Sequence, residues 1–108
     1  METVRLGNPC DTAVPPMEVR AAVDAGELPL RIPERIARRL RLEPVCRREI
    51  TDADGRRRFV PYAGPVEVWF RGRQCYVGAL VLGDEVSLGL LVLEEMDLTE
   101  PTIVRALK

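Results

Sequence analysis

The sequence predicts a single, mainly β domain with one or two short helices. Proline and glycine interrupt the chain at short intervals, which favours short strands joined by tight turns. A length of 108 residues accommodates one domain, residues 1–108, but not two separate cores. Between the breaks, runs rich in β-branched and aromatic residues predict strands at residues 3–6, 17–24, 45–51, 58–62, 66–71, 74–82 and 102–107.

Two consecutive runs supply the clearest strand patterns. Val66, Val68 and Phe70 alternate with polar residues or Trp, the period-two pattern of a half-buried strand. A turn is expected at residues 71–73, around a central glycine. The run at residues 75–82 is apolar on both faces, which predicts a central strand with cover on each side.

One segment departs from the β pattern and predicts a short amphipathic helix that begins at Pro33. Ile36, Ala37 and Leu40 fall on one side of it, and most of its arginines fall elsewhere. Proline suits the first helical position because its missing N–H has no partner there, and Pro44 forces the chain out of helix. Residues 90–96 are a second helix candidate.

Charge and hydropathy exclude several classes of function. Sixteen basic and seventeen acidic residues give a net charge of −1, so no overall field attracts nucleic acid or an anionic membrane. The apolar runs are too short to cross a bilayer, and no signal pattern opens the chain, which predicts a cytoplasmic protein. A nucleic-acid-associated β domain is the weakest alternative and would use the arginines Arg38, Arg39, Arg41, Arg47 and Arg48.

Cysteine and histidine content narrows the possible chemistry further. Cys10, Cys46 and Cys75 are odd in number and widely spaced, which indicates reduced structural thiols and neither a disulfide framework nor a metal site. The chain has no histidine, so Ser-His-Asp and Cys-His catalysis are excluded. We expect no cofactor and no metal, and carboxylates must therefore carry any hydrolysis.

The candidate carboxylate is Asp24, which ends an apolar strand and is followed by Ala25 and Gly26. Two interpretations apply to this tripeptide. In the first, the aspartate accepts hydrogen bonds from backbone amides in a solvent-facing turn and has no chemical role. In the second, the acid is catalytic, and this interpretation depends on the rest of the chain.

The order of features along the chain resembles the small bacterial retropepsin-like aspartic proteases. In that family a strand leads into Asp-Thr-Gly or Asp-Ser-Gly, and an apolar stretch, a short helix, a flap hairpin and a late apolar-apolar-Gly motif follow. The corresponding segments here are Asp24-Ala25-Gly26, residues 28–32, the helix from Pro33, the hairpin around Asp54, Gly55 and Arg56, and Leu88-Gly89 before the last helix.

The resemblance implies a closed β-barrel of the retropepsin type and an aspartic endopeptidase that acts as a homodimer. Asp24 from each chain would activate a water for hydrolysis of an extended peptide or protein substrate, under a flap at residues 51–61. The arginines Arg56, Arg57 and Arg58 would either favour acidic substrates or form a solvated charge run that protects a strand edge, and the second interpretation is preferred. Residues 102–107 are the expected dimer contact.

The sequence differs from the family pattern at two positions beside Asp24. Ala25 replaces a threonine or serine whose hydroxyl bonds across the dimer, and alanine has no group that can do so. Glu27 replaces a small residue and adds a carboxylate near the pair. The alternative function is therefore a non-catalytic binding or dimerisation module on the same fold.

Overall fold

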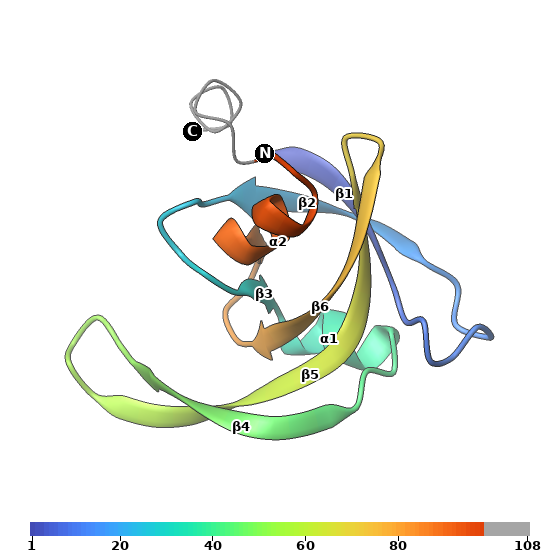
Figure 1. The fold of residues 1–108 in the computed structure, drawn as a ribbon. Helices are drawn as coiled ribbons and strands as arrows, with labels where there is room; N and C mark the ends of the chain where they lie inside the picture. Colours follow the sequence, from blue (N-terminus) through green and yellow to red (C-terminus); the bar gives the residue numbers. More distant parts are fainter. Residues whose placement is uncertain (99–108) are drawn as a thin grey trace.

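The computed structural model describes residues 1–98 and is mainly β (Figure 1). Most predicted strands are present. The runs predicted at 58–62 and 66–71 form one long strand that ends at Phe70, and the predicted strand at 102–107 lies outside the described residues. The elements are β1 (Glu2–Gly7), β2 (Met17–Val23), β3 (Leu30–Ile32), α1 (Glu34–Arg39), β4 (Pro44–Thr51), β5 (Arg57–Phe70), β6 (Arg73–Val81), β7 (Val86–Leu88) and α2 (Leu90–Glu95).

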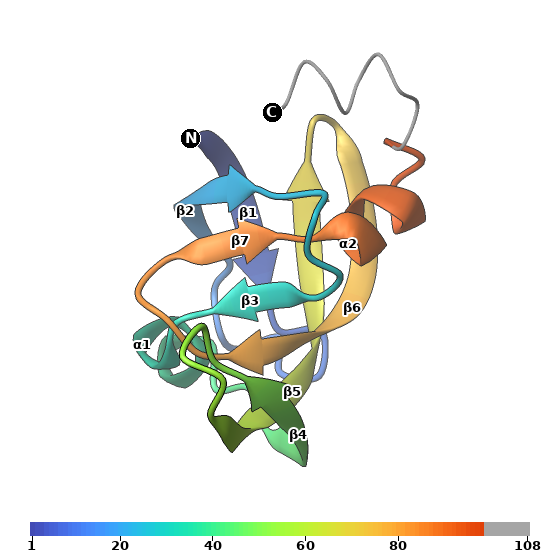
Figure 2. The same cartoon turned by 90° about the vertical axis from the view of Figure 1, so that its left-hand side faces the viewer.

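Six of the strands close into a barrel, which confirms the prediction of a closed β-barrel. The order is β1, β2, β7, β3, β6 and β5, and β1 returns to pair with β5. Figure 2 shows β2, β7, β3 and β6 one below another in this order. Two of the pairings, β2 with β7 and β3 with β6, are parallel, so the barrel wall is mixed.

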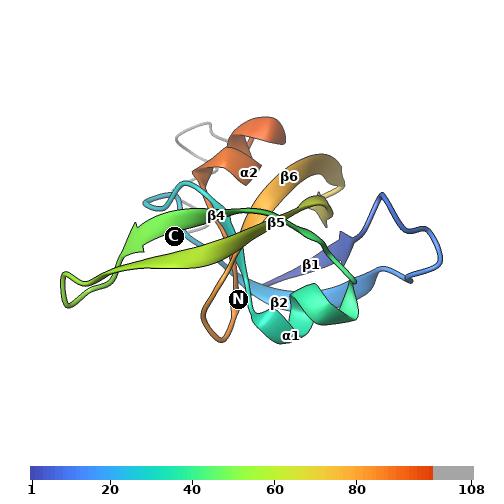
Figure 3. The same ribbon diagram turned by 90° about the horizontal axis from the view of Figure 1, so that it is seen from below.

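The strand β4 lies outside this closed wall. It pairs antiparallel with the first half of β5, from Pro44 opposite Ala63 to Thr51 opposite Arg57. We call this hairpin, residues 44–63, the arm. Figure 3 shows it projecting from the barrel as a curved two-stranded ribbon. Its turn carries Gly55 with φ 84° and is closed by a 2.7 Å hydrogen bond from the Asp52 N–H to the Arg56 carbonyl, which confirms the predicted hairpin.

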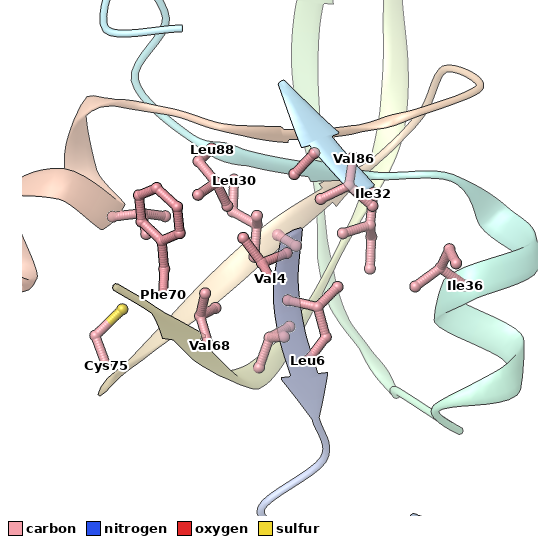
Figure 4. Packing of buried hydrophobic residues seen from close by; sticks show 14 of the residues in the cluster. Val4, Leu6, Leu30, Ile32, Ile36, Val68, Phe70, Cys75, Val86 and Leu88 are labelled. Atoms are coloured by element: carbon pink, nitrogen blue, oxygen red, sulfur yellow. The ribbon is translucent and has the colours of Figure 1, made fainter. Parts of the chain in front are cut away.

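Alternating apolar residues of the strands fill the barrel (Figure 4). The predicted inward set Val66, Val68 and Phe70 is buried. Ile36 of α1 extends the cluster at one end, and Val92 and Leu93 of α2 are buried with it. The other buried side chains of the cluster include Val4, Leu6, Leu30, Ile32, Val86 and Leu88.

The prediction for β6 was only half right. The strand is central, between β3 and β5, and its residues Cys75 and Ala79 are buried. The other face is only partly covered by the described chain, since Tyr76 is 58% exposed and Leu80 is half-buried. Its apolar character on that side has a different cause, because Leu80 lines a groove under the arm.

Both predicted helices are present, with α1 starting one residue later than expected because Pro33 is the N-cap. The end of α1 is closed by a residue from a distant segment. The Asn8 side-chain amide donates to the carbonyls of Leu40 at 3.0 Å and Arg41 at 3.1 Å. Among residues 1–98, no helix has the length and apolar character needed to cross a membrane.

The buried thiol of Cys75 should react far more slowly than those of Cys10 and Cys46, which are exposed. Burial, assisted by the nearby charge of Glu95, raises the pKa of the Cys75 thiol to about 11. Its thiolate fraction near pH 8 is then smaller by about a hundredfold than that of an ordinary thiol. Alkylation followed by mass spectrometry should show two fast sites and one slow site, and denaturant should abolish the difference. Equal rates in the folded protein would contradict this burial.

Candidate functional site

Asp24 lies immediately after β2, where the chain turns sharply toward β3. Its N–H donates to the Leu88 carbonyl at 2.9 Å, which ties the start of the turn to β7. The Gly26 N–H donates to Asp24 Oδ1 at 2.9 Å, and the Glu27 N–H donates to the Asp24 carbonyl at 3.2 Å. The residue is exposed, so the turn presents a carboxylate to solvent with one oxygen fixed. We call residues 24–27 the Asp24 turn.

The Leu88-Gly89 motif lies directly beside this turn. Leu88 is opposite Val23 in the parallel pairing of β7 with β2. A Cβ on Gly89 would overlap the carbonyl oxygens of Leu28 and Pro29, so only glycine allows the two segments to approach this closely. The structure therefore brings together the Asp24 turn and the Leu88-Gly89 motif, which are two of the three segments singled out in the sequence.

Two further hydrogen bonds join the same two segments. The Leu90 N–H donates to the Glu27 carbonyl at 2.7 Å, and the Leu91 N–H donates to the Leu28 carbonyl at 3.0 Å. These are the first amides of α2, which have no acceptor within the helix itself. The helix start and the Asp24 turn therefore stabilise each other.

The two residues that depart from the family pattern have different surroundings. Ala25 is half-buried and packs against the core cluster of its own chain. Glu27 forms an ion pair with Arg31, with 2.7 Å between Oε2 and Nη1. Arg31 and Asp24 line the same hollow of about 210 Å³, together with Ser87 of β7. The extra carboxylate at position 27 is therefore paired with a cation.

A groove lies between the arm and the loop that follows the Asp24 turn. It has two lobes of about 460 and 530 Å³. Asp24 does not line the groove, but Arg31 and Leu82 line both its second lobe and the hollow that contains Asp24. The groove and the carboxylate are thus neighbours. The residues common to both lobes are apolar, namely Leu28, Pro29, Ile50 and Leu80.

The tip of the arm is the third segment singled out in the sequence, and it does not line the groove or the hollow that contains Asp24. Asp54, Gly55 and Arg56 are exposed, and Asp54 Oδ1 accepts the Arg56 N–H at 3.1 Å. Neighbouring residues Asp52 and Ala53 line the second lobe of the groove. The tip therefore holds the turn together, while the segment just before it faces the groove.

The three consecutive arginines after the tip are each paired within the arm. Their partner atoms lie at 3.6 Å for Arg56 and Asp54, 3.4 Å for Arg57 and Glu49, and 3.0 Å for Arg58 and Asp52. All three arginine side chains are more than half exposed, so each pair contributes little stability. This arrangement agrees with the preferred interpretation of a solvated charge run.

The first lobe contains a stacked arrangement that sequence reasoning missed. The Tyr62 ring lies against Gly78, where an added Cβ would overlap its ring and hydroxyl atoms. The Arg48 guanidinium carbon lies 4.3 Å from the centroid of the same ring. A glycine inside an otherwise apolar strand is the available signal, because such a residue often marks a close approach of another group.

Neither the described side chains nor the comparisons with known proteins assign a chemistry directly. Among residues 1–98, no three His, Cys, Asp or Glu side chains gather in a group that could hold a metal ion. No protein-family model matches the sequence, and no curated protein matches it. Function is therefore inferred from the arrangement of the Asp24 turn and the groove.

Proposed function

We propose that the chain is an aspartic endopeptidase that acts as a homodimer, with Asp24 of each subunit at a shared centre. The observation that carries the proposal is the Asp24 carboxylate itself. It is exposed, held by the Gly26 amide, and adjacent to a groove with apolar walls under a projecting arm. A carboxylate that only stabilised the turn would accept the same hydrogen bond from Gly26. The groove beside it, in which a peptide could bind, is what favours a catalytic role.

The chemistry requires two such carboxylates. When two of them lie ~3 Å apart, as they do in aspartic proteases generally, they cannot both ionise and so share one proton. The ionised member accepts a proton from a bound water, which attacks the peptide carbonyl, and the protonated member donates a hydrogen bond to the carbonyl oxygen. A two-fold axis that passes beside Asp24 would create this pair from one sequence position.

The order of the elements supports this proposal beyond the single residue. The Asp24 turn, the arm and the Leu88-Gly89 motif before α2 follow one another as in the small retropepsin-like proteases that the sequence resembles. An extended peptide would lie in the groove and bond to the backbone of the arm. Residues 102–107 remain the predicted dimer contact, with their structure outside the described residues.

The rate of peptide cleavage should rise more than linearly with the concentration of the protein. Each active site needs two chains, so dilution below the dimer dissociation constant should lower the activity per chain. The measurement is cleavage of an unstructured peptide at mildly acidic pH over a dilution series, with the mass in solution followed by sedimentation. Activity per chain that stays constant while the protein is monomeric would contradict the proposal, as would a complete absence of cleavage at every pH.

A non-catalytic binding or dimerisation module is the second candidate, and the environment of Ala25 favours it. This side chain packs against the core of its own chain and carries no hydroxyl to bond to a second subunit. The same experiments separate the two candidates. The module should dimerise and bind peptide in the groove without hydrolysing it.

A further inference from the structure

Arg48 differs from the other arginines of the arm in its surroundings. Its guanidinium lies over the Tyr62 ring and lines the first lobe of the groove with Ile50. In the part of the chain that the structure describes, no carboxylate forms an ion pair with Arg48 or with Arg47, whereas Arg56, Arg57 and Arg58 each have one; of the two unpaired arginines, only Arg48 lines the groove. The groove therefore contains a cation that no described carboxylate contacts at ion-pair distance.

This cation is exposed, and its contact with the Tyr62 ring restricts its position. The Tyr62 ring packs against Gly78 of β6, and the Arg48 guanidinium carbon lies 4.3 Å from the centroid of that ring. A guanidinium that rests on an aromatic face keeps its N–H groups directed outward, where they can bind a carboxylate. The loss of side-chain freedom on binding is smaller for such a group than for a free surface arginine.

We propose that the groove selects extended peptides in which an acidic side chain lies two residues from a large apolar one. This proposal takes from the proposed function only that an extended peptide binds in the groove. Arg48 is the specificity-determining residue: its guanidinium binds the peptide carboxylate, while the apolar lining receives the second side chain.

The spacing of two residues follows from the geometry of β4. Arg48 and Ile50 are separated by one residue and line the same lobe, as side chains on one face of a strand do. In the described residues β4 pairs only with β5, so its other edge can accept an added strand. A peptide on that edge directs every second side chain to the same face, where Ile50, Leu28 and Leu80 form an apolar wall.

The opposite wall makes the preference directional. Glu95 of α2 lines the same lobe and repels a peptide carboxylate placed on its side. Glu49 also lines the lobe, but it is the partner of Arg57 at 3.4 Å. The acidic side chain is therefore favoured next to Arg48 and disfavoured next to α2.

Binding of fluorescent peptides to the Asp24→Asn protein tests the inference without interference from cleavage. The first set of peptides carries Leu and Glu two positions apart, in either order. A second set has Gln in place of Glu, and a third has Leu and Glu at adjacent positions. Fluorescence anisotropy at low salt should show that one of the two peptides with Leu and Glu two positions apart binds about fivefold more tightly than its Gln counterpart. This is the size of effect expected for a partly exposed ion pair. Arg48→Gln should remove this preference.

Arg47→Gln is the matched control, because Arg47 precedes Arg48 on the same strand and does not line the groove. It removes the same charge and should keep the fivefold preference. Equal binding of Glu and Gln peptides, a preference that survives Arg48→Gln, or no peptide binding at all would overturn the inference. Selective binding without cleavage by the unmodified chain contradicts the peptidase proposal alone, and cleavage without charge preference contradicts the Arg48 inference alone.

Discussion

Replacing Asp24 with asparagine should lower kcat/KM for peptide cleavage by about a thousandfold, within the range that a general acid–base group contributes. Asparagine keeps an oxygen that can accept the Gly26 N–H, so the turn should remain intact. It cannot take up or release the proton that hydrolysis requires. The measurement is steady-state cleavage of a peptide that the unmodified protein hydrolyses, with circular dichroism to verify the fold.

Asp84→Asn provides the matched control for this experiment. Asp84 is exposed and lines the same hollow as Asp24, so its replacement removes an equal charge from the same place. Surface substitutions usually change stability by no more than about 0.5 kcal/mol, so this variant should fold normally. Its cleavage rate should stay within about twofold of that of the unmodified protein, since Asp84 has no part in the proposed chemistry. If both variants lose activity equally, the effect is one of local charge, and Asp24 is not the reacting group.

Replacing Gly89 with alanine should reduce the free energy of unfolding by about 3 kcal/mol, at the upper end of the usual cost of overpacking. The added methyl would overlap the carbonyls of Leu28 and Pro29, which are backbone atoms that cannot rotate away. The turn and the start of α2 would have to separate, which breaks the bonds from Leu90 and Leu91. Urea denaturation at a fixed protein concentration measures the change.

Gly83→Ala separates this steric effect from the general cost of losing a glycine. Gly83 has φ 82°, and an added Cβ there meets nothing within 4 Å. Only the strain of the left-handed backbone remains, which amounts to about 1 kcal/mol. A loss for Gly89→Ala that does not exceed that for Gly83→Ala would show that the two segments do not pack as closely as described.

Local patterns were enough to predict most elements of the fold. The alternation of Val66, Val68 and Phe70 identified a strand and its buried face, and both helices lie where their apolar residues indicated. The second face of β6 was misinterpreted because a covered apolar face and a groove wall have the same composition. Only the position of the arm distinguishes them, and that position depends on contacts between distant segments.

The Asp24 turn and the Leu88-Gly89 motif were recognisable in the sequence, but the sequence did not show directly that the two lie side by side. Asp24 and Leu88 are far apart along the chain, and the parallel pairing of β2 with β7 makes them neighbours. The Arg48 and Tyr62 stack gave no comparable signal, because Arg48 belongs to a charged run that looks like an ordinary solvated surface. Gly78 was the one indication that another group approaches there.

The pairing of β1 with β5 is a short seam, made by Arg5 with Trp69, Leu6 with Val68 and Gly7 with Glu67. Because β1 also pairs with β2, removing the first seven residues would convert the cylinder into an open sheet with two unpaired borders. Open borders of this kind associate with other chains. An amino-terminal truncation would therefore add two open edges to that of β4 and promote further association between chains, even with the Asp24 turn untouched.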